Sequence, residues 1–373
     1  WVTDGRRAQM LAWTIGVVIF IESNITVLVA GSICRPLFDR FRVSREKLAY
    51  LIDSTSAPVC ILIPVNAWGA YILSLLAGLG VENAVPVLIA TIPLNFYALT
   101  ALLLAGVSAW RGLDIGPMAA AQERTAAGEL HWEHTVAIAD PEELAPPPRE
   151  GIPLRPVNMI LPIASMVLMM PVAMYITGDG DLMAGSGSVS VLWAVLTGIG
   201  VASVLSLGQK LLSLEELGTV GVRGAGGLTG MALVLLLALT LGAVTQELGT
   251  GEYVAGIVGD RVPLFLLIPL VFLVAAGIAF ATGSSWGTFA IMVPIAVPIG
   301  AALGLPITPF VAASLSGGVF GDHCSPISDT TIISSLASAS DHIEHVRTQL
   351  PYALAAGSVA AIGYSLVGVW LSV

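Results

Sequence analysis

The feature that most constrains the fold is a run of sixty consecutive residues, 262–321, that contains no Asp, Glu, Lys or Arg. About 20 apolar residues are enough for a helix to cross the ~30 Å hydrocarbon core of a bilayer. Only 11% of the whole chain is charged, whereas a soluble domain carries roughly 25%. Long uncharged runs favour helices over barrel strands, in which polar and apolar residues alternate. The sequence therefore predicts an all-α polytopic membrane protein.

The distribution of these runs predicts about nine or ten membrane segments in two groups. Residues 1–110 are expected to form a first transmembrane repeat, and residues 228–373 a second one. Residues 111–155 hold four basic and eight acidic residues and three consecutive prolines, so we expect a soluble linker with a short helix near 118–127. Residues 156–227 are expected to form central spans and an amphipathic connector.

Individual segments of the two repeats lead to different predictions. Ala8–Ile33 is long enough to cross the bilayer once, and Val85–Trp110 reads as a plain span. Leu48–Gly80 is too long for one simple span and is interrupted by prolines, so a discontinuous helix or a re-entrant hairpin is expected there. The proline-rich stretch Pro294–Pro309 predicts another broken helix.

A cluster of basic residues sets the expected topology. Residues 35–47 hold five basic and two acidic side chains, so the positive-inside rule places this loop in the cytoplasm. Arg6 and Arg7 would then lie on the opposite side if Ala8–Ile33 crosses once, and on the same side if it does not. No other basic face is present, which argues against a nucleic-acid partner. The three cysteines are far apart and lack zinc-site spacing, so we expect neither a bound metal nor a cofactor.

The most polar stretch among the apolar segments is GGVFGDHCSPISDTTIISS (317–335). Ionisable residues at membrane depth are costly and mark functional sites, and Pro326 leaves nearby backbone carbonyls free of helical bonds. Carboxylates, hydroxyls and carbonyls form an all-oxygen ligand set that suits a hard cation. An interfacial loop whose aspartates cap a helix is the alternative. The predicted cation- and proton-binding residues are Asp322, Asp329, Ser325, Ser328 and Thr330.

A second acidic segment lies in the first repeat. DSTSAP (53–58) shares an acid, hydroxyls and a proline with DHCSP (322–326), and each follows an apolar span interrupted by polar residues. Interrupted segments in matching positions of two halves are typical of a transporter binding site. A helix cap at the membrane surface is the alternative for the first aspartate. The further predicted site residues are Asp53, Ser56, Glu22, Asn24, Ser284 and Ser285.

Three histidines lie in or after the 317–335 stretch. Because histidine titrates near neutral pH, His323, His342 and His345 are candidates for pH sensing. A charged interfacial loop and a metal-binding pair remain alternatives for the latter two.

Three stretches carry a resemblance to a known family: GDHCSPISDTTIISS (321–335), DHIEHVRTQLPYA (341–353) and RPLFDRFRVSREKLAYLIDSTSAPV (35–59). They resemble the NhaC-type sodium/proton antiporters of the ion-transporter superfamily, over nearly the whole chain. The resemblance implies a secondary transporter of Na⁺ and H⁺ in a prokaryotic inner or plasma membrane, with inverted repeats and re-entrant hairpins. It also implies further helices upstream of Trp1. Relatives carry an acidic pair and an aromatic residue where this chain has Glu22-Ser-Asn.

The expected mechanism is competition between Na⁺ and H⁺ for buried carboxylates, whose charged form burial disfavours. Coupled transport of small organic anions or amino acids is the alternative, although no Arg lies in a predicted span to bind a carboxylate. A membrane enzyme is disfavoured, because His323 and Cys324 lack a third orienting group and GDGD (178–181) lacks the Tyr-Asp partner of an aspartyl protease. The sequence leaves a homodimer open.

Overall fold

The computed structural model describes residues 2–20, 22–82, 84–132, 155–181, 185–227 and 262–372, with scattered positions between 228 and 261. Within these residues the regular secondary structure is entirely helical. Four helices are long and apolar enough to cross a membrane: α10 (Val157–Thr177), α15 (Leu264–Thr282), α16 (Ser285–Ala302) and α19 (His342–Leu371). The all-α polytopic fold is therefore confirmed.

Two bent helix pairs raise the number of candidate spans in the described residues to six. The predicted nine or ten segments included shorter or more polar helices that this criterion of length and hydropathy does not count. Much of the start of the expected second repeat, residues 228–261, lies outside the described ranges. Most of the predicted linker, residues 133–154, lies outside them as well. The short helix expected near 118–127 is present as α8 (Pro117–Ala126).

The segment predicted as a single first crossing consists of two helices, α1 (Gly5–Val18) and α2 (Ser23–Arg40). Glu22 caps α2, because its carboxylate accepts a hydrogen bond from the amide of Ile25 at 3.0 Å, and the chain therefore restarts a helix there. A Cβ atom on Gly5 would lie 2.9 Å from Val43 Cγ2. The start of α1 thus lies beside the end of α2, and the two helices form a hairpin. The predicted single crossing is wrong.

This hairpin explains the positions of the N-terminal arginines. Arg6 and Arg7 lie at the start of α1, which is next to the basic loop that follows α2. They therefore lie on the same side as that loop, as expected for a segment that does not cross the bilayer.

The segment after the basic loop is discontinuous, as predicted. It comprises α3 (Arg45–Ser54), α4 (Ala57–Leu62) and α5 (Ala67–Gly78), and the axis bends by 44° before α5. Asn66 stabilises the bend, because its side-chain oxygen accepts from the Gly69 amide and its nitrogen donates to the carbonyl of Cys60. Backbone groups freed by the break are thereby paired.

The predicted plain span at Val85–Trp110 is wrong. It is a bent pair made of α6 (Ala84–Thr91), a short 3₁₀ helix η1 (Ile92–Leu94) and α7 (Phe96–Arg111), with an angle of 47°. Pro93 lacks an amide hydrogen and interrupts the α-helical hydrogen bonds at this point.

The second half has the same kind of breaks. A left-handed cap at Gly283 (φ 66°) ends α15, and the Ser284 hydroxyl caps α16. Pro294 and Pro298 lie inside α16, which ends at Ala302, and α17 (Thr308–Cys324) begins at Thr308, so the helix is interrupted within the proline-rich stretch, after Pro298. A further break lies between α17 and α18 (Asp329–Ser338).

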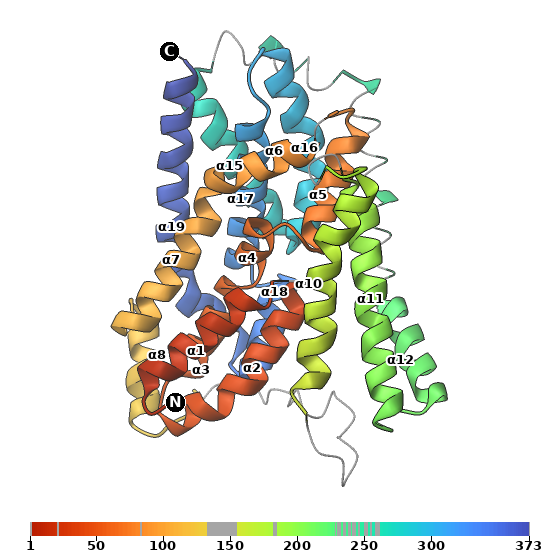
Figure 1. Cartoon of the computed structure of the whole chain (residues 1–373). Helices are drawn as coiled ribbons and strands as arrows, with labels where there is room; N and C mark the ends of the chain where they lie inside the picture. The colour runs from red at the N-terminus through yellow and green to blue at the C-terminus, as the bar shows by residue number, and fades with distance from the viewer. Residues whose placement is uncertain are drawn as a thin grey trace.

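The two halves pack in a reciprocal pattern with opposite orientation. α1 contacts α2, α3 and α7, just as α15 contacts α16, α17 and α19. α2 contacts α18, and α16 contacts α5, so each hairpin lies against the broken helix of the other half. In Figure 1, α1 to α3 lie at the lower end and α15 and α16 in the upper part. Inverted repeats generate such an arrangement.

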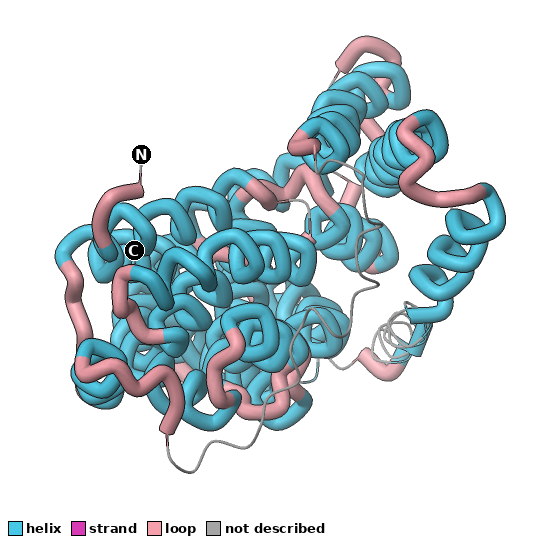
Figure 2. Tube along the Cα trace, turned by 90° about the horizontal axis from the view of Figure 1, so that it is seen from below, coloured by secondary structure: helices cyan, strands magenta, loops and turns pink. Residues whose placement is uncertain are grey.

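A smaller group of helices stands at one side of this bundle. α10 packs mainly against α11 (Gly187–Gly208), which also contacts α5. α12 (Leu214–Gly227) follows them, and Figures 1 and 2 show all three at the edge of the molecule.

Candidate functional site

The two broken helices bring two aspartates into the interior of the bundle. Asp53 lies in the last turn of α3 and Asp322 in the last turn of α17. Both side chains are 0% exposed. α18 packs against both α2 and α3, so its hydroxyl-rich first turns lie between the two carboxylates.

The carboxylate of Asp322 is only partly hydrogen-bonded. Its Oδ2 atom accepts from the Thr330 hydroxyl at 3.1 Å, and that hydroxyl lies 3.1 Å from the Ser328 hydroxyl. Its Oδ1 atom is buried and has no partner among the described residues. The hydroxyl of Ser285, at the start of α16, is likewise buried and has no partner there at hydrogen-bond geometry, but it lies close enough to Asp322 to stabilise its carboxylate. Two buried oxygens are therefore available to a ligand.

The carboxylate of Asp53 is held by several donors. Gln349 Nε2 donates to Oδ2 at 2.6 Å, Ser334 Oγ donates to Oδ1 at 3.2 Å, and Thr331 Oγ1 lies 3.5 Å from Oδ2. His345 Nε2 lies 4.0 Å from Oδ2. Hydrogen bonds to an ionised carboxylate are stronger than neutral ones, so this network fixes the position of Asp53.

One threonine lies between the carboxylate of Asp53 and the backbone of Asp322. The Thr331 hydroxyl lies 3.5 Å from Asp53 Oδ2 and 3.5 Å from the backbone carbonyl oxygen of Asp322. The negative charges of Asp53 and Asp329 both act on Asp322. Like charges at such a site favour binding of a proton or a cation.

Asp329 does not join the buried pair. It is exposed at the first position of α18, where its Oδ1 atom accepts from the Thr330 amide at 2.9 Å. Its own amide lies 3.4 Å from the carbonyl oxygen of Gly283, at the tip of the α15–α16 hairpin. Asp329 therefore lies beside the cluster and stabilises the start of α18.

Glu22 and Asn24 line a separate cavity of about 570 Å³ between the bundle and the α10–α11 pair. Asn24 Nδ2 donates to Glu22 Oε1 at 3.3 Å. Asn66 and Trp286 also line this cavity, and its other walls are mainly aliphatic. The cavity is wide enough for a small organic molecule as well as for a hydrated ion.

Three of the predicted ligands bond to the backbone instead. Ser56 donates to the carbonyl of Asp53, and Ser325 donates to the carbonyl of Phe280, both at 2.8 Å. Ser284 accepts from the Gly287 amide as the cap of α16. These side chains shape the breaks around the site.

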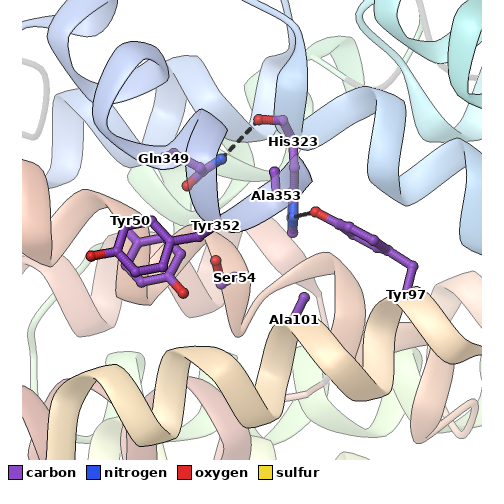
Figure 3. A pocket seen from close by; sticks show the side chains of 8 residues that line it. All are labelled: Tyr50, Ser54, Tyr97, Ala101, His323, Gln349, Tyr352 and Ala353. Atoms are coloured by element: carbon purple, nitrogen blue, oxygen red, sulfur yellow. Dashed lines mark hydrogen bonds between the residues drawn. The ribbon is translucent and has the colours of Figure 1, made fainter. Parts of the chain in front are cut away.

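Figure 3 shows the surroundings of His323, which is 1% exposed. Its Nδ1 atom lies 2.9 Å from the hydroxyl of Tyr97 on α7, and its backbone carbonyl accepts from Gln349 Nε2 at 3.0 Å. His323 thus faces away from the Asp322 hydroxyl cluster.

His342 and His345 lie in the first turn of α19 and share one partner. The hydroxyl of Ser335 lies 3.0 Å from Nδ1 of His342 and 2.8 Å from Nδ1 of His345. His345 is fully buried, whereas His342 is partly exposed.

Four residues around the carboxylates were missed as site residues: Thr331, Ser334, Gln349 and Tyr97. The first two lie in the hydroxyl-rich stretch, one and four positions after the predicted ligand Thr330. Gln349 has an amide side chain near the start of the long final helix, and this polar residue in an apolar helix is the feature that could have identified it. Nothing in the sequence distinguished Tyr97 from other membrane tyrosines.

Comparisons with known proteins agree with this architecture. The model of the Na⁺/H⁺ antiporter family matches residues 59–369. An uncharacterized protein of Haemophilus influenzae is 35% identical over 98% of this chain and 72% of its own length. The malate-2H⁺/Na⁺-lactate antiporter of Bacillus subtilis is 38% identical, over 28% of this chain and 22% of its own length.

The arginine/ornithine antiporter ArcD of Halobacterium salinarum is 37% identical, over 28% of this chain and 21% of its own length. The family match covers most of the chain, so the protein is a membrane transporter and not an enzyme. The resemblance in the signature stretches is thereby confirmed: this chain belongs to the Na⁺/H⁺ antiporter family.

Proposed function

We propose that the protein exchanges Na⁺ for H⁺ across the cell membrane by competition at Asp322. The observation that carries this proposal is the unpaired, fully buried Oδ1 atom of Asp322 among the described residues. A buried carboxylate oxygen without a partner costs free energy until a proton or a cation satisfies it. Either ligand fits, and the two exclude each other.

The neighbouring oxygens support a cation of the hard type. Ser285 Oγ and the hydroxyls of Ser328 and Thr330 surround the carboxylate with neutral oxygen atoms. Alkali and alkaline-earth ions prefer such ligands. Asp53, held by its own donors, contributes a second negative charge that attracts a cation to the site.

The inverted arrangement supports movement between two states. We take residues 1–110 and 228–373 as the two repeats. Helix α2 of the first hairpin approaches α18 of the other half so closely that a Cβ atom on Gly31 would lie 2.6 Å from the Cβ atom of Ala337. Displacement of one hairpin against the opposite broken helix would open the site to one side at a time.

The test is Na⁺-driven proton movement in proteoliposomes with an acidic interior. Addition of external Na⁺ is expected to raise the internal pH, and choline is expected to have no effect. Asp322→Asn should reduce this flux at least about a hundredfold, the range for loss of an essential proton-transfer group. Asp179→Asn is the matched control, because Asp179 is an exposed loop residue with φ 50°, a conformation that Asn adopts readily. Unchanged exchange in Asp322→Asn would refute the assignment.

Transport of a small organic solute is the second candidate, because the cavity beside Glu22 is larger than one ion requires. Two relatives are named as antiporters of malate and lactate or of arginine and ornithine. The same vesicles, tested with amino acids and dicarboxylates, separate the candidates. A pH response that requires an organic solute, with none to Na⁺, Li⁺ or K⁺ alone, would favour the second.

A further inference from the structure

A chain of polar side chains connects Asp53 to a partly exposed imidazole. Asp53 Oδ2 lies 4.0 Å from His345 Nε2, and both side chains are fully buried. His345 Nδ1 lies 2.8 Å from Ser335 Oγ, which lies 3.0 Å from His342 Nδ1. Nε2 of His342 lies 2.6 Å from the carbonyl oxygen of Pro326. The chain therefore leads from the buried carboxylate toward the surface.

The outer end of this chain lies at the basic face of the molecule. His342 is the first residue of α19 and follows the turn after α18. Arg45, the first residue of α3 and part of the basic cluster 35–47, donates to the carbonyl of Ala339 in that turn at 3.2 Å. The positive-inside rule assigns this face to the cytoplasm. The cavity at Glu22 has other walls, formed with α10 and α11, so the two routes are separate.

The hydrogen-bond partners fix the tautomer of His345. Gln349 Nε2 donates to Asp53 Oδ2 at 2.6 Å and to the carbonyl oxygen of His323 at 3.0 Å. This orientation of the amide directs Gln349 Oε1 to His345 Nε2, at 3.1 Å. Because an amide oxygen only accepts, His345 Nε2 carries a hydrogen.

His342 is fixed in the same way, since its Nε2 atom faces the carbonyl oxygen of Pro326. Both imidazoles therefore present Nδ1 to the one hydroxyl of Ser335. That hydroxyl has one hydrogen and can donate it to only one of the two rings. When both contacts are hydrogen bonds, the other Nδ1 atom carries its own hydrogen, so one ring of the pair then holds an additional proton.

We propose that His342, Ser335 and His345 form a proton relay between the cytoplasmic face and Asp53. This inference rests on the proposed function, because a proton on Asp53 removes the second negative charge that attracts the cation to Asp322. The titratable groups that face His345 are Asp53 on α3 and His342 on its own helix. Both take part in the relay.

The transfer conserves atoms and charge. The Nδ1 proton of His342⁺ passes to Ser335 Oγ while the hydroxyl proton of Ser335 passes to His345 Nδ1. His345 then gives its Nε2 proton to Asp53 Oδ2, after an approach of about 1 Å that converts the 4.0 Å contact into a hydrogen bond. His342 and His345 are left neutral, and Asp53 is left protonated.

Ser335→Ala tests the relay, and Ser338→Ala is the matched control. Ser338 is a buried serine of the same helix whose hydroxyl bonds to the carbonyls of Ser334 and Ser335. Two fluxes are measured in proteoliposomes: Na⁺-driven proton movement, and ²²Na⁺/Na⁺ exchange at equal pH on both sides. Ser335→Ala should lower the first at least about tenfold and the second far less. Ser338→Ala should not separate the two fluxes. Ser335→Thr, which keeps a hydroxyl, should restore most of the proton flux.

Equal loss of both fluxes in Ser335→Ala would overturn the relay. Absence of both fluxes in the unmodified protein would instead overturn the proposed function. ¹⁵N NMR of the two imidazoles in detergent supplies a readout that does not need transport. Near about pH 7, we expect the pair to hold one proton more than two neutral rings do, and Ser335→Ala to lose it. Two neutral rings in the unmodified protein would contradict the relay.

Discussion

Asp53 and Asp322 occupy equivalent places in the two halves, but their carboxylates differ in how many hydrogen-bond donors hold them. Each lies in the last turn of a helix that ends at a break inside the bundle. Asp53 is held through Gln349 and Ser334, whereas Asp322 has one hydroxyl donor and, in the described part of the chain, an unpaired oxygen. The same backbone plan thus produces one carboxylate that is held by several donors and one that is open to a ligand.

The surroundings stabilise the carboxylate of Asp53 and destabilise that of Asp322 when no ligand is bound. A hydrogen bond to a charged group contributes about 1.5–3 kcal/mol, and an unpaired buried polar atom costs about 1–3 kcal/mol. The surroundings of Asp53 therefore hold its side chain in place without any further ligand. The surroundings of Asp322 favour binding of a proton or a cation.

The largest predicted difference is in stability. Asp53→Ala removes the acceptor of Gln349 and Ser334 and should lower the free energy of unfolding by about 3 kcal/mol. Asp322→Ala removes an acceptor with one donor and relieves an unpaired charge, so it should cost less than about 1 kcal/mol. Thermal unfolding of the two variants in detergent measures this difference. Equal losses of stability in the two variants would contradict the difference assigned to the two carboxylates.

A smaller effect is expected from two serines. Ser334→Ala deletes a donor to Asp53 and should lower stability by about 1 kcal/mol while the affinity for Na⁺ stays constant. Ser285→Ala deletes a hydroxyl without a partner in the described residues, so stability should hold and Na⁺ affinity should fall by about fivefold, or 1 kcal/mol. Ser314→Ala is the control, because that buried hydroxyl bonds to the carbonyl of Phe310 in its own helix.

A decrease in Na⁺ affinity for Ser334→Ala, or a loss of stability for Ser285→Ala, would reverse the roles assigned to the two carboxylates. Calorimetric titration with Na⁺ and thermal unfolding of the same samples distinguish these results.

Equal or smaller effects are expected at the hairpin tips. Ser284→Ala removes the cap of α16 and should cost about 1 kcal/mol of stability. Glu22→Gln keeps an oxygen that accepts from the Ile25 amide, so stability should change by less than about 0.5 kcal/mol. It removes a negative charge from the cavity and should slow Na⁺ uptake by about threefold at low salt. Initial rates of ²²Na⁺ uptake measure this, and an increase in rate would contradict an entry role for Glu22.

The sequence predicted the helical membrane fold and the cluster around Asp322 because both depend on local patterns. The uncharged run 262–321 specifies membrane helices, and Pro326 with its hydroxyl neighbours specifies a break. The α1–α2 hairpin was not predicted, because Ala8–Ile33 has the hydropathy of a span. The deciding group is the carboxylate of Glu22, which caps α2 and leaves the preceding turn outside a helix.

The relative roles of the acidic residues could not be predicted from spacing. Asp322 and Asp329 are seven positions apart in one signature, but the break in the chain buries the first and exposes the second. The donors to Asp53 lie almost three hundred residues away in the chain, on α18 and α19. Such pairings depend on tertiary packing, which hydropathy does not encode.

The most direct test of the account is the affinity of the purified protein for Na⁺ as a function of pH. If Na⁺ and H⁺ compete for Asp322, the dissociation constant for Na⁺ should rise by about tenfold for each unit by which the pH is lowered in the acidic range. Asp322→Asn should bind Na⁺ weakly at every pH. A dissociation constant that does not change with pH, or an unchanged affinity in Asp322→Asn, would contradict competition at this carboxylate.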